Sequence, residues 1–198
     1  MKLNRHIIAV LFLSLVNVFT LNSCGGGGGS SEGVTAAEAS IDSLFDPTAV
    51  SAKSCTVEFS AFKDDSGNQF NIRFNCNSTG AITSCTITAQ PSDAGLQTET
   101  RTSTSADNYW NQGGGNLTNV TFYCEETSVL NQFKANIIID LMRITNTNRD
   151  GEGKLLGFNA SIQTARAYIV VPGVTSYPTQ FFVAPGTNVT VTYKGTSN

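Results

Sequence analysis

The acid–base and metal chemistry open to this chain rests on carboxylates, because histidine is almost absent. His6 is the only histidine, and histidine is the usual general base near neutral pH and the commonest ligand of transition metals. It lies within residues 1–23, which have the character of a removable signal. Without that segment, catalytic triads, cysteine–histidine pairs and histidine-bound zinc are all excluded.

The adjacent carboxylates are Glu125–Glu126 and Asp64–Asp65. Neighbouring side chains on a strand point to opposite faces, so Glu125 and Glu126 cannot flank one glycosidic bond as a hydrolase pair must. Asp64–Asp65 begin a polar segment typical of a hairpin turn. We therefore expect a protein that is not an enzyme. A polysaccharide hydrolase whose carboxylates converge from distant parts of the chain is the alternative.

One segment carries oxygen ligands at the spacing of a calcium loop. These residues are Asn146, Asn148, Asp150 and Glu152. They match the D-x-[DN]-x-[DN]-G start of an EF-hand, but its twelfth position, which needs a bidentate Glu, is Gly157. A hairpin turn through Asp150 and Gly151 explains the same residues. We expect no cofactor, with calcium as the alternative.

The candidate ligand-binding surface is an aromatic segment followed by three glycines. It consists of Tyr109, Trp110, Asn111 and Gln112. Flat rings beside amides suit the apolar faces and the hydroxyl groups of a sugar. Tryptophan is also common in cores and lids, so a carbohydrate-binding or adhesive module and a purely structural role for Trp110 both stay open.

The N-terminus has the order of a secretory signal. Basic Lys2 and Arg5 precede a mainly apolar run over 7–21, which is shorter than the roughly 20 residues of a membrane-spanning helix. The segment Leu21-Asn22-Ser23-Cys24 follows. It resembles the lipobox of bacterial lipoprotein precursors, although Asn22 is larger and more polar than the usual residue. An ordinary signal peptide cut nearby is the alternative.

The resemblance implies cleavage before Cys24 and acylation of its sulfur, with palmitate among the expected acyl chains. Gly25, where an Asp would retain the protein in the inner membrane, favours the outer membrane of the cell envelope, facing either the periplasm or the surface. Residues 24–34 are rich in Gly and Ser and predict a flexible tether. The partners expected are the membrane, through acyl chains, and a glycan or an envelope protein.

The chain that follows the signal is acidic. Removing Lys2 and Arg5 from the 12 basic residues leaves 10 against 15 acidic ones, a formal charge of −5. No basic run interrupts it, so a nucleic-acid partner is not expected. Its length of 175 residues, 198 minus 23, predicts a single domain, which we place at residues 35–198.

Four cysteines remain once Cys24 is assigned to lipid. They are Cys55, Cys76, Cys85 and Cys124. An even number in an exported chain predicts two disulfides. A zinc site of four thiolates is the alternative, although the chain has no C-x-x-C pair.

Alternating residues around the first two cysteines favour one disulfide pairing. In a hairpin with Ala61 opposite Phe70, three further pairs align on one face: Phe59 with Ile72, Val57 with Phe74, and Cys55 with Cys76. Cys85 would then pair with Cys124. An inter-sheet connectivity stays open, because directly opposed strand cysteines often lack good disulfide geometry.

The remaining pattern predicts an all-β protein with one short helix. A capping box and helical spacing place the helix at 36–45. We expect eight or nine short strands, an exposed or edge segment at 98–105, a central strand at 133–144 with apolar residues on both faces, and a last hairpin across 184–187. The architecture expected is an antiparallel β-sandwich, immunoglobulin-like or jelly-roll-like.

Overall fold

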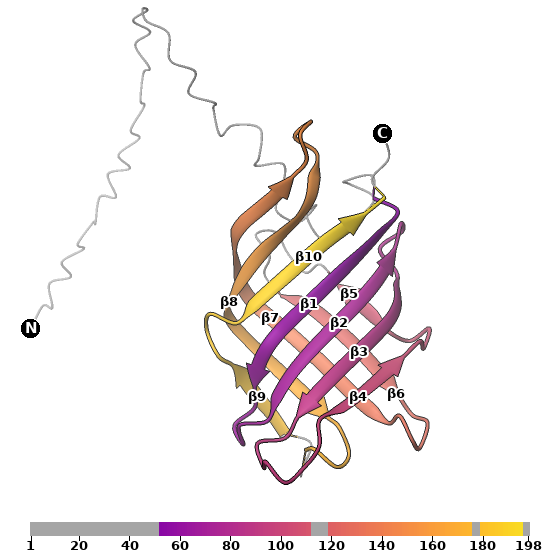
Figure 1. Cartoon of the computed structure of the whole chain (residues 1–198), viewed down its shortest axis with the longest axis vertical. Helices are drawn as coiled ribbons and strands as arrows, with labels where there is room; N and C mark the ends of the chain where they lie inside the picture. Colours follow the sequence, from indigo (N-terminus) through magenta and orange to yellow (C-terminus); the bar gives the residue numbers. More distant parts are fainter. Residues whose placement is uncertain (1–51, 112–118, 176–178, 196–198) are drawn as a thin grey trace, which may run out of the picture. The chain divides into compact units, whose positions relative to one another are not determined.

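The computed structural model describes residues 52–111, 119–175 and 179–195. Within these ranges the protein is all-β and antiparallel, without helices. The strands are β1 (Ser54–Lys63), β2 (Gln69–Asn77), β3 (Ile82–Gln90), β4 (Glu99–Ser103), β5 (Tyr109–Asn111), β6 (Val120–Glu126), β7 (Phe133–Arg149), β8 (Leu155–Val170), β9 (Thr179–Val183) and β10 (Asn188–Lys194) (Figure 1). The helix predicted at 36–45 lies outside the described residues.

All ten strands belong to one hydrogen-bonded sheet. Its order is β4-β3-β2-β1-β10-β8-β7-β6-β5, and β9 pairs with β8 beside this path. The predicted all-β, antiparallel class is therefore confirmed. A sandwich of two separate sheets is not confirmed, because β8 connects what would be the two layers. β4 lies at one end of the sheet, in agreement with the edge strand predicted at 98–105.

The hairpin of β1 and β2 has the predicted register up to one interruption. Cys55 faces Cys76, Val57 faces Phe74 and Phe59 faces Ile72, but Phe70 is opposite Phe62 instead of Ala61. A β-bulge between Phe59 and Phe62 inserts Ala61 at a φ of 56° and turns its side chain to solvent. The bulge buries Phe62, a larger apolar side chain, in place of Ala61.

The long hairpin of β7 and β8 explains the apolar residues on both faces of the 133–144 segment. Register shifts lie between Ile139, Leu141 and Met142. They reverse the phase of the strand, so Ile139 and Met142 are both buried while Leu141 is 45% exposed. β7 is an interior strand of the sheet, as predicted, but the expectation that both of its faces are covered was wrong, because a register shift brings Ile139 and Met142 to the same face.

β9 and β10 do not form the predicted last hairpin. Both run antiparallel to β8: Thr179–Val183 pairs with Ile169–Ala165, and Asn188–Thr192 pairs with Ser161–Gly157. The intervening turn is also bonded to β8, because Ile162 N donates to Thr187 O at 2.9 Å and Gly186 N donates to Ile162 O at 2.8 Å. The segment is thus one interrupted strand along β8.

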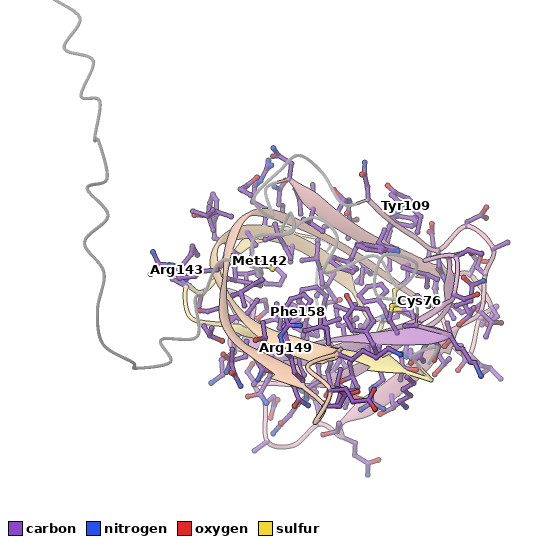
Figure 2. The ribbon with its side chains drawn as sticks, turned by 90° about the horizontal axis from the view of Figure 1, so that it is seen from above. Cys76, Tyr109, Met142, Arg143, Arg149 and Phe158 are labelled. Atoms are coloured by element: carbon purple, nitrogen blue, oxygen red, sulfur yellow. A yellow bond between two sulfur atoms is a disulfide. The ribbon has the colours of Figure 1, made fainter. Side chains whose placement is uncertain are left out.

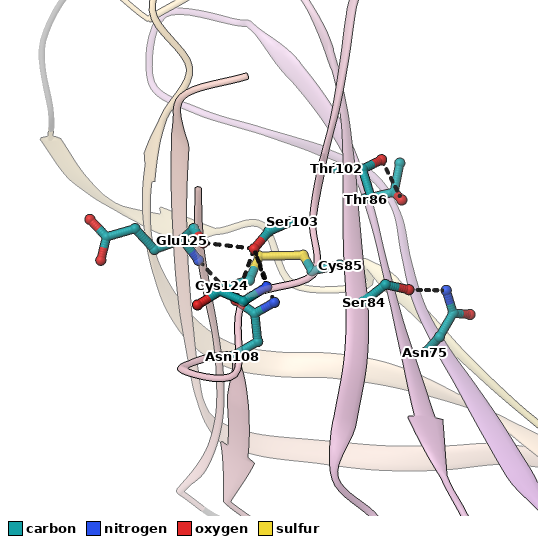
Figure 3. Close-up of a disulfide and its surroundings, with 10 residues drawn as sticks. Asn75, Ser84, Cys85, Thr86, Thr102, Ser103, Asn108, Cys124 and Glu125 are labelled. Atoms are coloured by element: carbon teal, nitrogen blue, oxygen red, sulfur yellow. Dashed lines mark hydrogen bonds between the residues drawn. A yellow bond between two sulfur atoms is a disulfide. The ribbon is translucent and has the colours of Figure 1, made fainter. Parts of the chain in front are cut away.

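The sheet curls until β4 approaches β6, although neither strand is a neighbour of the other in the sheet order. A disulfide from β3 to β6 joins Cys85 to Cys124, whose Cα atoms are 6.3 Å apart. Beside it, Ser103 Oγ donates to Glu125 O at 2.7 Å, Asn108 Nδ2 donates to Ser103 Oγ at 3.1 Å, and Glu125 N donates to Asn108 Oδ1 at 3.1 Å (Figure 3). These side-chain hydrogen bonds connect β4 to β6, two strands that are not paired with each other in the sheet.

The inward side chains of the curled sheet meet in one core that contains two aromatic clusters. In the first, the ring centroid of Phe122 lies 5.0 Å from that of Phe59 and 5.1 Å from that of Phe74. In the second, Phe62 and Phe70 each lie 6.3 Å from Phe181. Seen from above, Phe158 and Met142 point into the interior whereas Arg143 lies outside it (Figure 2).

Candidate binding site on the outward face of the sheet

The four cysteines form the two expected disulfides. Cys55 pairs with Cys76 across the first hairpin, and Cys85 pairs with Cys124 across the closure of the sheet. Both connectivities are those favoured by the predicted hairpin register. Cys24, the predicted lipidation site, lies outside the described residues, so lipidation stays a prediction.

Tyr109 and Trp110 do not form one aromatic surface. They lie on a short strand, β5, instead of the expected loop, and successive strand residues point to opposite faces. The half-buried ring of Trp110 stacks on Phe122 at 5.8 Å, and its Nε1 donates to the Gly80 carbonyl. Its packing favours the core interpretation of this residue. Tyr109 is 49% exposed and lies at the periphery (Figure 2).

The partner of Tyr109 on the outward face is Tyr123 of β6. The two residues are opposite each other in the β5–β6 ladder, and their rings stack with centroids 5.2 Å apart at 19°. Lys134 Nζ lies 5.3 Å from the centroid of Tyr123 and 3.5 Å from Glu125 Oε2. We call Tyr109, Tyr123, Glu125 and Lys134 the tyrosine patch.

The polar groups of the tyrosine patch shift one another's titration. Tyr123 Oη donates a hydrogen bond to Glu125 Oε2, which lowers the pKa of that carboxyl, and Lys134 lowers it further. The same hydrogen bond, together with partial burial, raises the pKa of Tyr123. The pKa of Lys134 is raised, chiefly by its interaction with Tyr123. At neutral pH the patch thus holds a neutral phenol between a carboxylate and an ammonium group.

Of the two remaining residues of the predicted aromatic segment, one is described by the structure. Asn111 is exposed on the same face as Tyr109, and Gln112 lies outside the described residues. Tyr123, Glu125 and Lys134 were not predicted as members of the site. The signal was present for Tyr123, because Phe122 and Cys124 alternate inward and leave the residue between them facing outward.

The calcium candidate is a hairpin turn with its main carboxylate already engaged. Asn146 and Asn148 are exposed on β7, and Asp150 and Glu152 follow in the turn to β8. Asp150 Oδ1 accepts Lys154 N at 2.8 Å and Glu152 N at 3.0 Å. Among the residues described, no three His, Cys, Asp or Glu side chains gather closely enough to hold a metal ion.

A hollow of about 290 Å³ lies on the outward face of β1, β2 and β3, in the half of the sheet opposite the tyrosine patch. Its polar side chains already have hydrogen-bond partners, either within the lining or on neighbouring strands. Glu58 accepts from Arg73 at 2.9 Å, Asn71 Oδ1 accepts from Ala61 N at 2.7 Å, and Asn75 Nδ2 donates to Ser84 at 2.8 Å. Because no aromatic ring lines it, this hollow offers less to a ligand than the tyrosine patch.

The part of the chain that the structure describes contains no helix long and apolar enough to cross a membrane. Comparison with protein-family models, with curated proteins and with solved structures finds no significant match to this chain.

Proposed function

We propose that this chain is an exported lipoprotein, anchored in the bacterial outer membrane through an acylated Cys24, whose folded body binds a carbohydrate without chemical turnover. The observation that carries the binding role is the stacking of the exposed ring of Tyr109 on the partly buried ring of Tyr123, beside Glu125 and Lys134. The observations that support export are the leader, the lipobox-like segment and the two disulfides.

The tyrosine patch combines the two kinds of contact that sugars need. Tyrosine rings present apolar faces to C–H groups and keep a hydroxyl for hydrogen bonding. Glu125 accepts hydrogen bonds and Lys134 donates them. Tyr109 remains half exposed, and the Tyr123 ring on which it stacks also contacts Lys134, so the exposed ring is presented on a surface that is already packed.

The proposed architecture treats the two halves of the curled sheet as facing layers, as in a sandwich. It is supported by the contacts of Phe59 and Phe74, on one half, with Phe122 on the other. A helix at 36–45 covering one end of the sheet belongs to the same proposal.

The membrane address is tested by mass spectrometry of the protein purified from the membrane fraction. We expect a mature N-terminus at Cys24 carrying acyl mass, and a Cys24→Ala variant that is recovered in the soluble fraction. Two or more acyl chains are needed, because one chain gives only marginal anchoring. A mature Cys24 without acyl mass would refute this part of the proposal.

The binding role is tested by titrating the full chain, in detergent, with a panel of mono- and oligosaccharides in a calorimeter. Tyr109→Ala should weaken binding of the recognised sugar, since it removes the exposed ring of the patch. Leu130→Ala is the matched control, because Leu130 is 90% exposed in the β6–β7 turn and lies outside the patch. Equal effects of the two substitutions would rule out the patch as the site.

A further inference from the structure

The tyrosine patch is one end of a longer row of outward side chains. Ladder partners connect Tyr109 to Tyr123, Tyr123 to Asn136, Asn136 to Tyr168, and Tyr168 to Gln180. These five residues come from five strands, β5, β6, β7, β8 and β9, which lie side by side in the rear half of the sheet (Figure 1). We call them the five-residue row.

We infer that the five-residue row binds a single, uncharged polysaccharide chain along its length. The inference rests on the proposed function and adds to it the length, charge and physical form of the ligand. Strands are about 4.8 Å apart, so four intervals span about 19 Å. A track of this length fits several consecutive sugar rings, which can stack on Tyr109 and Tyr123 at one end of the row and on Tyr168 beside Gln180 at the other.

The middle and far end of the row provide hydrogen-bonding amides at a shallow hollow. The hollow has a volume of about 120 Å³, and its lining includes Asn136, Tyr168 and Gln180. Asn136 Oδ1 is buried there and has no hydrogen-bond partner among the described residues. Rotation about the last side-chain bond exchanges the amide oxygen with the NH2 group, so Asn136 can accept from or donate to a sugar hydroxyl that enters the hollow.

The charges beside the row cancel. Glu125 lies 3.5 Å from Lys134, and Asp140 lies 3.2 Å from Arg166. Neither sign is left in excess to attract an acidic or a basic polymer. The amides and phenols of the row itself are uncharged, which favours a neutral glycan over uronic-acid chains.

The twist of the sheet limits the form of the ligand. Adjacent strands rotate by roughly 20–25°, so the row turns by about 80–100° over its four intervals. A single flexible chain can follow this path, whereas the flat surface of a crystalline polysaccharide can contact only part of it. The row therefore favours dissolved chains.

The test measures affinity against chain length for the full protein in detergent. The probes are N-acetylglucosamine, glucose and their β-1,4-linked oligomers of two to six rings, malto-oligosaccharides of the same lengths, a hyaluronan hexasaccharide, a proline-rich decapeptide, and insoluble crystalline cellulose and chitin. The variants are Tyr168→Ala and Gln180→Ala in the row, with Thr88→Ala on the opposite outward face as the control. Gln180 is exposed, so its substitution leaves the fold intact.

We expect the affinity for one neutral series to rise about tenfold or more between one ring and four or five rings, and then to level off. Gln180→Ala and Tyr168→Ala should reduce that rise while Thr88→Ala preserves it. A length-independent affinity that Tyr109→Ala abolishes would overturn the row and leave the proposed function standing. Binding of hyaluronan, the peptide or the crystalline polymers alone would also overturn the row. Absence of binding to every probe would overturn the row and the proposed function together.

Discussion

Tyr123 is the residue on which the electrostatics of the tyrosine patch depend, because its hydroxyl donates to Glu125 and its ring lies beneath Lys134. The pKa of Glu125 is lowered, so its contribution to stability is complete above the ordinary value of 4.5 and is lost as pH falls through the lowered pKa. The pKa of Tyr123 is raised, so its contribution is complete below 10.0 and is lost as pH rises through the raised pKa.

Tyr123→Phe tests this linkage at a single atom. Removing the hydroxyl should return the pKa of Glu125 toward its ordinary value, as measured by NMR titration of the carboxyl carbon. The difference in free energy of unfolding between the native protein and the variant should be present at pH 7 and should shrink below pH 4.5. Glu126 is the internal control, because its pKa is lowered by hydrogen bonds from Ser128 and not by Tyr123, so it should not change in the variant. An unchanged Glu125 titration would contradict the assignment.

Only part of the tyrosine patch was predictable from the sequence. Tyr109 is exposed, as expected of a surface aromatic, but Trp110 was grouped with it in one candidate surface, with a core role left open, because the segment was expected to be a loop. Once Tyr109–Asn111 is a strand, alternation separates the two rings. Tyr123 becomes the partner only through the β5–β6 ladder, a pairing between segments separated by a glycine-rich stretch that sets no register.

At the scale of the strand, the register of β1 and β2 was predictable until the bulge. Period-two alternation specified every pair from Cys55–Cys76 to Phe59–Ile72. It could not show that Phe62 would displace Ala61, because that exchange costs a left-handed backbone conformation and is offset only by burial in the second aromatic cluster. The bulge in β7 and the pairing of β9 with β8 were not predictable for the same reason, because tertiary packing selects them.

At the bulged residue Ala61, we expect glycine to stabilise the strand, which is the opposite of its usual effect. Ala61 has a φ of 56°, a conformation that costs a non-glycine residue roughly 1–2 kcal/mol. Ala61→Gly removes this cost but gives the unfolded chain more freedom, so we expect a net gain of about 0.5–1 kcal/mol. Ala61→Val should be destabilising, because a β-branched residue tolerates this region least. Urea unfolding measures both, and a loss of stability in Ala61→Gly would argue against the bulge.

Gly157 is required where β8 meets β10. A Cβ atom at this position would lie 2.2 Å from the Val191 carbonyl oxygen, which belongs to the backbone of the paired strand. Gly157→Ala should therefore cost about 1–3 kcal/mol or more, since the two strands must separate. Gly151→Ala in the β7–β8 turn is the control, because nothing lies within 4 Å of its added Cβ. Equal stabilities of the two variants by urea unfolding would contradict the β8–β10 pairing.

For the whole molecule, the closure between β4 and β6 had one signal in the sequence, the predicted pairing of Cys85 with Cys124, but the hydrogen-bond network beside that disulfide had none. It depends on Ser103 and Asn108, two buried polar residues in a segment without an apolar face. Ser103→Ala leaves the Asn108 amide and the Glu125 carbonyl without this hydrogen-bonding partner, so we expect a loss of about 1–3 kcal/mol. Thermal unfolding measures this loss, and Thr104→Ala, at the neighbouring exposed position, should be nearly neutral in the same measurement. A neutral Ser103→Ala would show that the closure does not need this network.

The two disulfides should contribute unequally, because they constrain the chain at different scales. Cys55 and Cys76 are 21 residues apart and link strands that are already paired, whereas Cys85 and Cys124 are 39 residues apart and join the two halves of the curled sheet. Loop entropy alone gives about 3 kcal/mol for the first and about 4 kcal/mol for the second. Loss of the second should also free the closure around Ser103. We therefore expect the Cys85→Ala/Cys124→Ala protein to unfold at a lower urea concentration than the Cys55→Ala/Cys76→Ala protein. The reverse order would place the main constraint in the first hairpin and contradict this account of the closure.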